Sequence, residues 1–98
     1  MVGILYHDDY LNHITQIDHP ERPGRVTVIV NEFNKEKYKN HLVWEQPRLA
    51  EIEEIKYVHS ESYIHRVKET AGPSPQYLDS PDTLVSAGSY QAALRAAG

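Results

Sequence analysis

The sequence predicts an α/β fold, on the basis of two short apolar runs and the spacing between them. The runs, residues 2–6 and 42–44, are typical of β-strands and are separated by enough chain for a helix. A strand, a helix and a second strand in that order form a βαβ unit, whose strands are parallel. Because a stable sheet usually needs more than two strands, we expect the chain, residues 1–98, to be an incomplete part of a larger α/β domain.

The first predicted strand and the segment after it differ in polarity. Residues 2–6 are nearly continuous in apolar side chains, which is typical of a central strand buried on both faces. Residues 7–23 are polar, and Pro20 and Pro23 interrupt any helix. We therefore predict a long loop after the strand.

A helix is predicted over residues 23–38. Pro23 suits the first helical position, where its missing N–H costs nothing. The β-branched run over residues 26–30 favours a strand by intrinsic propensity, so the helix prediction depends on amphipathic spacing. The side chains with this spacing are Val26, Ile29, Val30 and Phe33.

The second half of the chain is predicted to be mainly helical. Apolar residues follow helical spacing from residue 52 onward, and Ser60 or Ser62 is expected to cap a helix that stops at the Gly-Pro pair 72–73. Ser86 or Ser89 is expected to begin a last helix. One face of that helix carries Tyr90, Ala93, Leu94 and Ala97.

Composition excludes several classes of protein. The net charge of −4, without a basic block, argues against a nucleic-acid surface, because such a surface must neutralise phosphates. No apolar run approaches the ~18 residues typical of a membrane span, so we expect no membrane partner. The chain has no cysteine, which is compatible with the cytoplasm, where we expect the protein to reside.

Two segments contain candidate site residues. In HPERPGR, residues 19–25, two prolines stiffen a loop that brings arginines and a carboxylate to a helix start. This is either a helix start with surface charges or a place where a buried arginine orients an anionic group. In LDSPDT, residues 78–83, Asp79 and Asp82 lie in a turn that we expect just before a helix. Their carboxylates either stabilise that turn and helix or accept substrate N–H groups at a pocket rim.

The six histidines form no recognisable metal-binding pattern. His7, His13 and His19 follow one another at intervals of six, and His59 and His65 have the same spacing, which is too wide for adjacent ligands on one helical face. We therefore expect no metal site in this chain. A histidine-rich metal-binding protein is the least favoured of three hypotheses for its function. A serine-nucleophile elbow and a glycine-rich phosphate loop are also missing from the sequence.

Five segments resemble, in order, the N-terminal region of the histone deacetylase superfamily, which includes acetylpolyamine amidohydrolases and acetoin-utilisation proteins. They are GILYH (3–7), HPERPGR (19–25), VHSESYI (58–64), LDSPDT (78–83) and AALRAAG (92–98). The second segment is closer to the bacterial, archaeal and class II-like branches than to class I enzymes. The resemblance implies the N-terminal part of a three-layer α/β/α arginase/deacetylase fold with parallel strands. It also implies hydrolysis of acetyl-amides with one catalytic zinc.

The resemblance implies roles for five residues of this chain. Arg25 corresponds to the arginine that lines an internal channel behind the active site, with Gly24 and His19 nearby. Asp82 corresponds to the rim aspartate that holds the substrate backbone. Asp79 is the second candidate, because Asp82 keeps the family's distance to the closing Ala-Gly.

The family's catalytic histidine pair, zinc ligands and carbonyl-polarising tyrosine are expected beyond Gly98, so we assign no catalytic or metal residue to this chain. The first hypothesis is the N-terminal part of a zinc-dependent deacetylase, which supplies the first loop and the rim aspartate and is inactive alone. Its intact form would act on an acetylated small molecule or a protein lysine. The alternative is a noncatalytic α/β interaction module that self-associates or binds a partner, such as the missing C-terminal part, through an open sheet edge.

Overall fold

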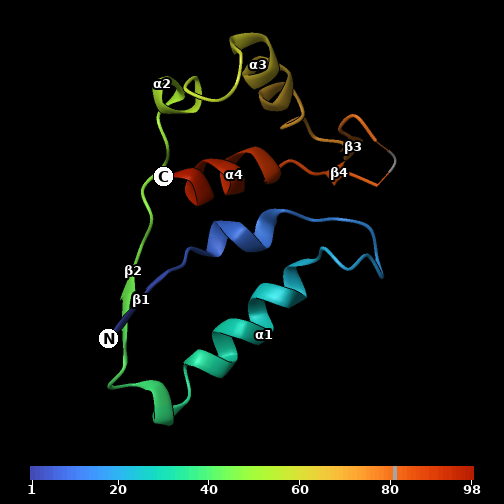
Figure 1. Cartoon of the computed structure of the whole chain (residues 1–98). Helices are drawn as coiled ribbons and strands as arrows, with labels where there is room; N and C mark the ends of the chain where they lie inside the picture. Colours follow the sequence, from blue (N-terminus) through green and yellow to red (C-terminus); the bar gives the residue numbers. More distant parts are fainter. Residues whose placement is uncertain (81) are drawn as a thin grey trace.

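Two parallel strands form the sheet that the sequence predicts. In the computed structural model, which describes residues 1–80 and 82–98, β1 (Val2–Leu5) pairs with β2 (Leu42–Glu45). Val2 lies opposite Leu42 in the parallel register. The βαβ prediction is confirmed, because the longest helix of the first half lies between the two strands in the chain (Figure 1).

The prediction that the first strand is buried on both faces is wrong. Val2 is 58% exposed and Leu5 is 65% exposed, and the side chains of Val43 and Trp44 on β2 are also exposed. Within the described residues this sheet has only two strands, so little of the chain covers it. Burial of an apolar strand depends on neighbouring elements, and the composition of the strand does not reveal whether they are present.

The segment after β1 contains a short 3-10 helix, η1 (Asp8–Asn12), where the sequence predicts only a loop. The Nδ1 atom of His7 caps it by accepting a hydrogen bond from the Asp9 N–H at 3.0 Å. Residues 13–22 then follow an irregular path, and we refer to them as the first loop.

The first long helix, α1 (Pro23–Phe33), begins at the predicted proline. It ends earlier than predicted, because Lys35 has extended backbone angles and a separate 3-10 helix, η2 (Glu36–Tyr38), follows. The rings of Phe33 and Tyr38 pack edge to face with centroids 5.6 Å apart, which holds η2 against the end of α1. Amphipathic spacing therefore predicts the helix better than β-branched propensity does.

Two helices follow β2. The first, α2 (Ile52–Ile55), is a single turn that begins with a capping box between Glu51 and Glu54. The second, α3 (Glu61–Glu69), is capped by Ser60, whose Oγ accepts a hydrogen bond from the Tyr63 N–H at 3.2 Å. Ser60, rather than Ser62, is thus the capping residue.

A short antiparallel hairpin, absent from the sequence prediction, joins β3 (Gln76–Tyr77) to β4 (Leu84–Val85). The Leu78 N–H donates to the Thr83 carbonyl at 2.8 Å and closes the turn. Asp79 has a φ of 64°, which aspartate tolerates because its short polar side chain can bond locally. The turn therefore leads into a strand and not, as predicted, into a helix.

The last helix, α4 (Ser89–Ala97), begins at one of the two predicted serines. Its predicted apolar face is confirmed, because that face lines a hollow of about 280 Å³ shared with apolar side chains of α2 and α3. Few hydrophobic side chains of the described residues are buried, and they form a small cluster around α4. This cluster contains Ala50, Ile64, Val85 and Ala92.

Gly88 allows α4 to start in close contact with η1. A Cβ atom at Gly88 would lie 2.5 Å from the carbonyl oxygen of Asn12, which belongs to the backbone and cannot rotate away. Glycine therefore permits a close approach that a side chain would prevent.

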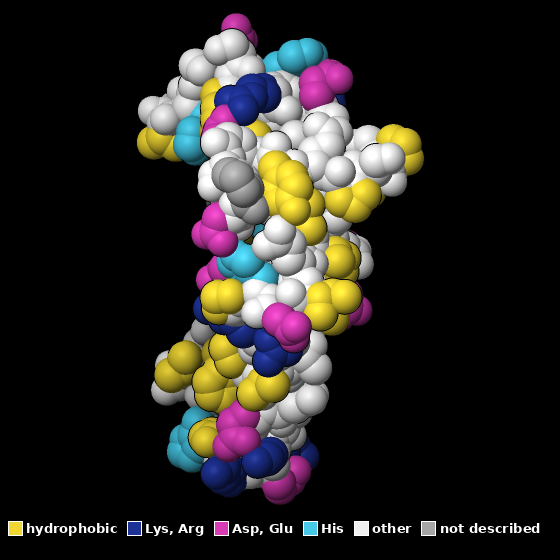
Figure 2. Space-filling model, turned by 90° about the vertical axis from the view of Figure 1, so that its right-hand side faces the viewer, with side chains coloured by type: hydrophobic (Ala, Val, Ile, Leu, Met, Phe, Trp, Pro, Cys, Tyr) yellow, Lys and Arg dark blue, Asp and Glu magenta, His cyan; other side chains and the backbone are white. Residues whose placement is uncertain are grey.

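The structure is extended for its length. The radius of gyration is 15.2 Å, whereas a compact domain of this size has about 13 Å. Figure 2 shows hydrophobic side chains exposed along the length of one face. Together with the parallel strand pair, this confirms the predicted incomplete α/β fold. None of the helices in residues 1–80 and 82–98 is long and apolar enough to cross a membrane.

Candidate functional site

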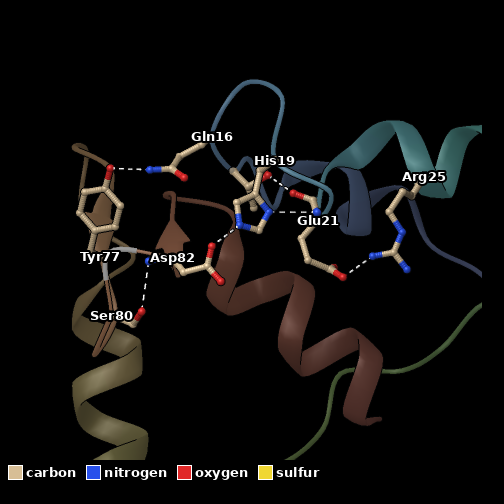
Figure 3. A network of polar contacts seen from close by, with 8 residues as sticks. Gln16, His19, Glu21, Arg25, Tyr77, Ser80 and Asp82 are labelled. Atoms are coloured by element: carbon tan, nitrogen blue, oxygen red, sulfur yellow. Dashed lines mark hydrogen bonds and ion pairs between the residues drawn. The ribbon is translucent and has the colours of Figure 1, made fainter.

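The first loop and the β3–β4 hairpin lie side by side although they are far apart in the sequence. The Nε2 atom of His19 lies 2.7 Å from Oδ1 of Asp82, and Gln16 Nε2 donates to the Tyr77 hydroxyl at 2.8 Å (Figure 3). The fold thus brings together two of the predicted site residues, His19 and Asp82. No local sequence pattern predicts this pairing.

Both nitrogen atoms of the His19 ring have hydrogen-bond partners. Nδ1 accepts the backbone N–H of Glu21 at 3.0 Å, so the neutral ring carries its proton on Nε2 and donates it to Asp82. The His19 side chain is 14% exposed, whereas the Asp82 side chain is 82% exposed. A largely covered imidazole therefore holds a carboxylate that faces solvent.

The two aspartates of the hairpin turn have different partners. The Asp82 N–H donates to Ser80 Oγ at 3.1 Å, and its carboxylate reaches the first loop. The Asp79 carboxylate instead forms an ion pair with Arg66 of α3. The predicted stabilisation of a helix start by these carboxylates is wrong, because β4 follows the turn. Pro81 of the same turn lies outside the described residues.

Arg25 lies in the first turn of α1 with its guanidinium half-exposed. Its Nη1 pairs with the carboxylate of Glu21, four residues earlier in the chain, and its side chain is 53% exposed. In this chain, the local environment of Arg25 therefore corresponds to a helix start with surface charges and not to a buried arginine.

Gly24 lies beside an open hollow on the first loop. The guanidinium of Arg22 covers the position where a Cβ atom of Gly24 would project. Both residues line the hollow, whose volume is about 570 Å³, and Arg25 is not among its lining residues. The other lining residues are Thr15, Gln16, Ile17, Asp18 and Pro23.

A polar cluster that the sequence analysis misses ties the first loop to α4. Ser89 Oγ lies 2.6 Å from His13 Nδ1, and Ser86 Oγ accepts the Ile14 N–H at 2.9 Å and donates to the Asn12 carbonyl at 3.1 Å. Both serines are buried. The sequence predicts each serine as a helix start and gives no sign of these contacts, because the partners are distant in the sequence.

Arg95 of α4 contacts two further segments. Its Nε donates to Asp9 Oδ2 at 3.1 Å, and its Nη1 donates to the Pro47 carbonyl at 3.0 Å. Arg95 stands in the last resemblance segment, AALRAAG, but the helical pattern gives no indication of these partners. This arginine therefore ties η1 and the segment after β2 to α4.

The zinc site that the resemblance implies takes no ligand from residues 1–98. Across residues 1–80 and 82–98, no group of three or more His, Asp or Glu side chains could hold a metal ion. His13 and His19 instead bond to Ser89 and Asp82.

The known proteins similar to this chain include a probable deacetylase. Residues 19–98 match the histone deacetylase domain. The chain is 31% identical over 100 residues to a probable deacetylase of Archaeoglobus fulgidus, an alignment that covers 100% of this chain and 27% of that protein. It is 34% identical over 96 residues to an uncharacterized protein of Synechocystis sp., covering 95% of this chain and 31% of that protein.

The structural likeness extends over nearly the whole chain. The crystal structure of the HDA15 HD domain superposes with a TM-score of 0.84 at 25% identity, covering 99% of this chain and 29% of that one. The chain thus spans less than a third of these relatives. Because the domain match includes most of its residues, the chain belongs to the histone deacetylase domain family.

Proposed function

We propose that the chain is the N-terminal part of a zinc-dependent deacetylase that hydrolyses acetyl-amide bonds of the acetyl-lysine or acetylpolyamine type. The observation that carries the proposal is the alignment of nearly the whole chain with 27% of the probable deacetylase and 29% of the HDA15 domain. The rest of each relative has no counterpart in this chain. The chain would thus supply one portion of a larger site.

In this proposal the chain contributes part of the rim of the site. Asp82 presents a solvent-exposed carboxylate, which suits the N–H groups of an acetylated small molecule or of a protein lysine. His19 and Gly24 would form the adjoining part of the first loop and helix start. Arg25 would line the internal channel only where further residues cover its exposed guanidinium.

The chain alone is proposed to be inactive. A zinc ion in an amide hydrolase lowers the pKa of bound water and so supplies the nucleophile. The side chains of residues 1–80 and 82–98 offer no group that could hold the metal. We propose that the zinc ligands and acid–base residues come from outside this chain, and that the complete enzyme works in the cytoplasm.

A chimera tests the proposal. Residues 1–98 replace the matching segment of the Archaeoglobus fulgidus probable deacetylase, which aligns with the whole chain. We expect the zinc-loaded chimera to hydrolyse an acetyl-lysine peptide or an acetylpolyamine, and the 98-residue chain with zinc to hydrolyse neither. A folded but inactive chimera, or turnover by the chain alone, would contradict the proposal.

The same chimera tests the role assigned to Asp82. Asp82→Ala should raise KM, because it removes an acceptor for substrate N–H groups. Unchanged KM would overturn the rim assignment.

The role assigned to Arg25 is tested separately in the chimera. Arg25→Ala should lower kcat, because the channel arginine is proposed to act during catalysis or acetate exit. An unchanged kcat would overturn the channel assignment.

The exposed sheet favours a second candidate function, a noncatalytic interaction module. Val2, Leu5, Val43 and Trp44 expose apolar surface on both strands, and an uncovered strand edge can pair with another chain. In this case the 98-residue chain should sediment as a dimer or larger species. A monomer at every concentration would contradict this candidate.

A further inference from the structure

The contact between His19 and Asp82 links two structural units. His19 belongs to the first loop, whereas Asp82 belongs to the hairpin turn, and the two are separated by 63 positions. The Gln16–Tyr77 hydrogen bond joins the same two units (Figure 3). The position of the Asp82 carboxylate is therefore coupled to the conformation of the first loop.

The donor side of the contact is fixed by the backbone. The Glu21 N–H occupies Nδ1 of His19, which leaves the neutral ring with a proton on Nε2, directed at Asp82. The acceptor side is held as well, because the Asp82 N–H bonds to Ser80 Oγ. Backbone groups thus orient both partners.

The contact uses only one oxygen of the carboxylate. Oδ1 of Asp82 accepts from His19, and among the residues that the structure describes Oδ2 has no hydrogen-bond partner. Since the Asp82 side chain is 82% exposed, Oδ2 is accessible to a ligand. A carboxylate can accept separate donors on its two oxygens at once.

We propose that His19 is a positioning residue, which holds Oδ1 of Asp82 so that Oδ2 accepts an amide N–H of the acetylated substrate. This inference rests on the proposed function of Asp82 and adds the residue that orients it. A hydrogen bond from a neutral imidazole to a carboxylate that is 82% exposed contributes little to stability. Removing the imidazole should therefore affect substrate binding much more than folding.

A spectroscopic experiment tests the contact without reference to activity. The ring nitrogens of His19 are recorded by long-range proton–nitrogen spectra in the 98-residue chain and in the chimera, each with and without Asp82→Ala. We expect a ring protonated at Nε2, whose Nε2 signal shifts and whose proton exchanges faster once Asp82 is removed. Identical His19 signals with and without Asp82, in both proteins, would overturn the inference and leave the proposed deacetylase function untouched.

A kinetic experiment tests the positioning role in the chimera. His19→Ala should raise KM by about three- to tenfold, as expected for the loss of one exposed charge-assisted hydrogen bond, with little change in kcat. His19→Gln keeps a side-chain N–H donor and should recover much of the loss. His65→Ala removes an exposed histidine of α3 as a matched control and should leave both constants unchanged.

A double variant, with both His19 and Asp82 replaced by alanine, separates the positioning role of His19 from the rim assignment of Asp82. If His19 acts through Asp82, His19→Ala should add nothing to Asp82→Ala. Independent, multiplicative effects on KM, or a loss in kcat alone, would overturn the positioning role. An Asp82→Ala variant with unchanged KM would instead overturn the rim assignment on which the role depends. The melting temperature of each variant identifies any loss that is due to unfolding.

Discussion

The hairpin side of the molecule and the sheet side are held together in different ways. On the hairpin side, side chains of the first loop bond to residues more than sixty positions away, as in the contacts of His19 with Asp82 and of His13 with Ser89. On the sheet side, β1 and β2 are joined by backbone pairing, and the side chains of Val2 and Leu5 are mainly exposed.

This difference shows which part of the fold depends on further neighbours. Directed hydrogen bonds between named side chains specify the path of the first loop within this chain. An apolar sheet gains stability mainly from what covers it, and these two strands have little cover. The chain thus organises its proposed rim itself and leaves its sheet open.

The largest effect is expected in the small core beside the hairpin. Ile64→Ala should lower the free energy of unfolding by about 2–4 kcal/mol, because Ile64 is buried in the cluster around α4. Urea denaturation of the 98-residue chain measures the change. Ile17→Ala, at a 92% exposed position of the first loop, is the control and should have little effect. Equal losses in the two variants would remove the distinction between core and surface.

A smaller effect is expected where η1 meets α4. Gly88→Ala should destabilise the chain by about 1–3 kcal/mol, because the new Cβ would collide with the backbone of Asn12. Gly3→Ala is a suitable control, because a Cβ at Gly3 meets nothing within 4 Å. Thermal unfolding of both variants compares the two regions directly. A Gly88→Ala variant as stable as Gly3→Ala would show that the contact is not close in solution.

On the sheet side, a charged substitution should affect self-association of the chain and hardly affect its stability. Leu5→Lys should alter the free energy of unfolding by less than about 0.5 kcal/mol, because Leu5 is already exposed. If the chain self-associates through the sheet, the same substitution should shift its sedimentation toward the monomer. Ile17→Lys places the same charge on the first loop and should leave sedimentation unchanged. A strongly destabilised Leu5→Lys variant would show that β1 is covered.

The smallest effect concerns the start of α2. Hydrogen bonds from the Arg48 side chain, and then from the backbone at Glu51, lower the pKa of Glu54 from 4.5 to about 2. Because the folded-state pKa is depressed, the stabilisation by Glu54 is present above pH 4.5 and declines as the pH falls toward 2.

Unfolding of the wild type and of Glu54→Gln, followed between pH 6 and pH 2, checks this effect. The stability difference between the two proteins should shrink with acidification. A difference that stays constant across the range would contradict the assigned pKa.

The sequence by itself determined the parts of the protein that depend on local chemistry. Proline at the first helical position, apolar spacing and a capping serine predicted the starts of α1, α3 and α4. The two apolar runs predicted the parallel strand pair, and five ordered segments led to the histone deacetylase family. These signals suffice because each arises from residues close together in the chain.

Only the tertiary structure decided the contacts between distant segments. The pairing of His19 with Asp82, the ion pair of Asp79 with Arg66 and the exposure of β1 all depend on which segments the folded chain brings together. A side-chain hydrogen bond requires atoms within about 3 Å. Burial likewise depends on neighbours in space, and the apolar composition of β1 does not show whether those neighbours are present.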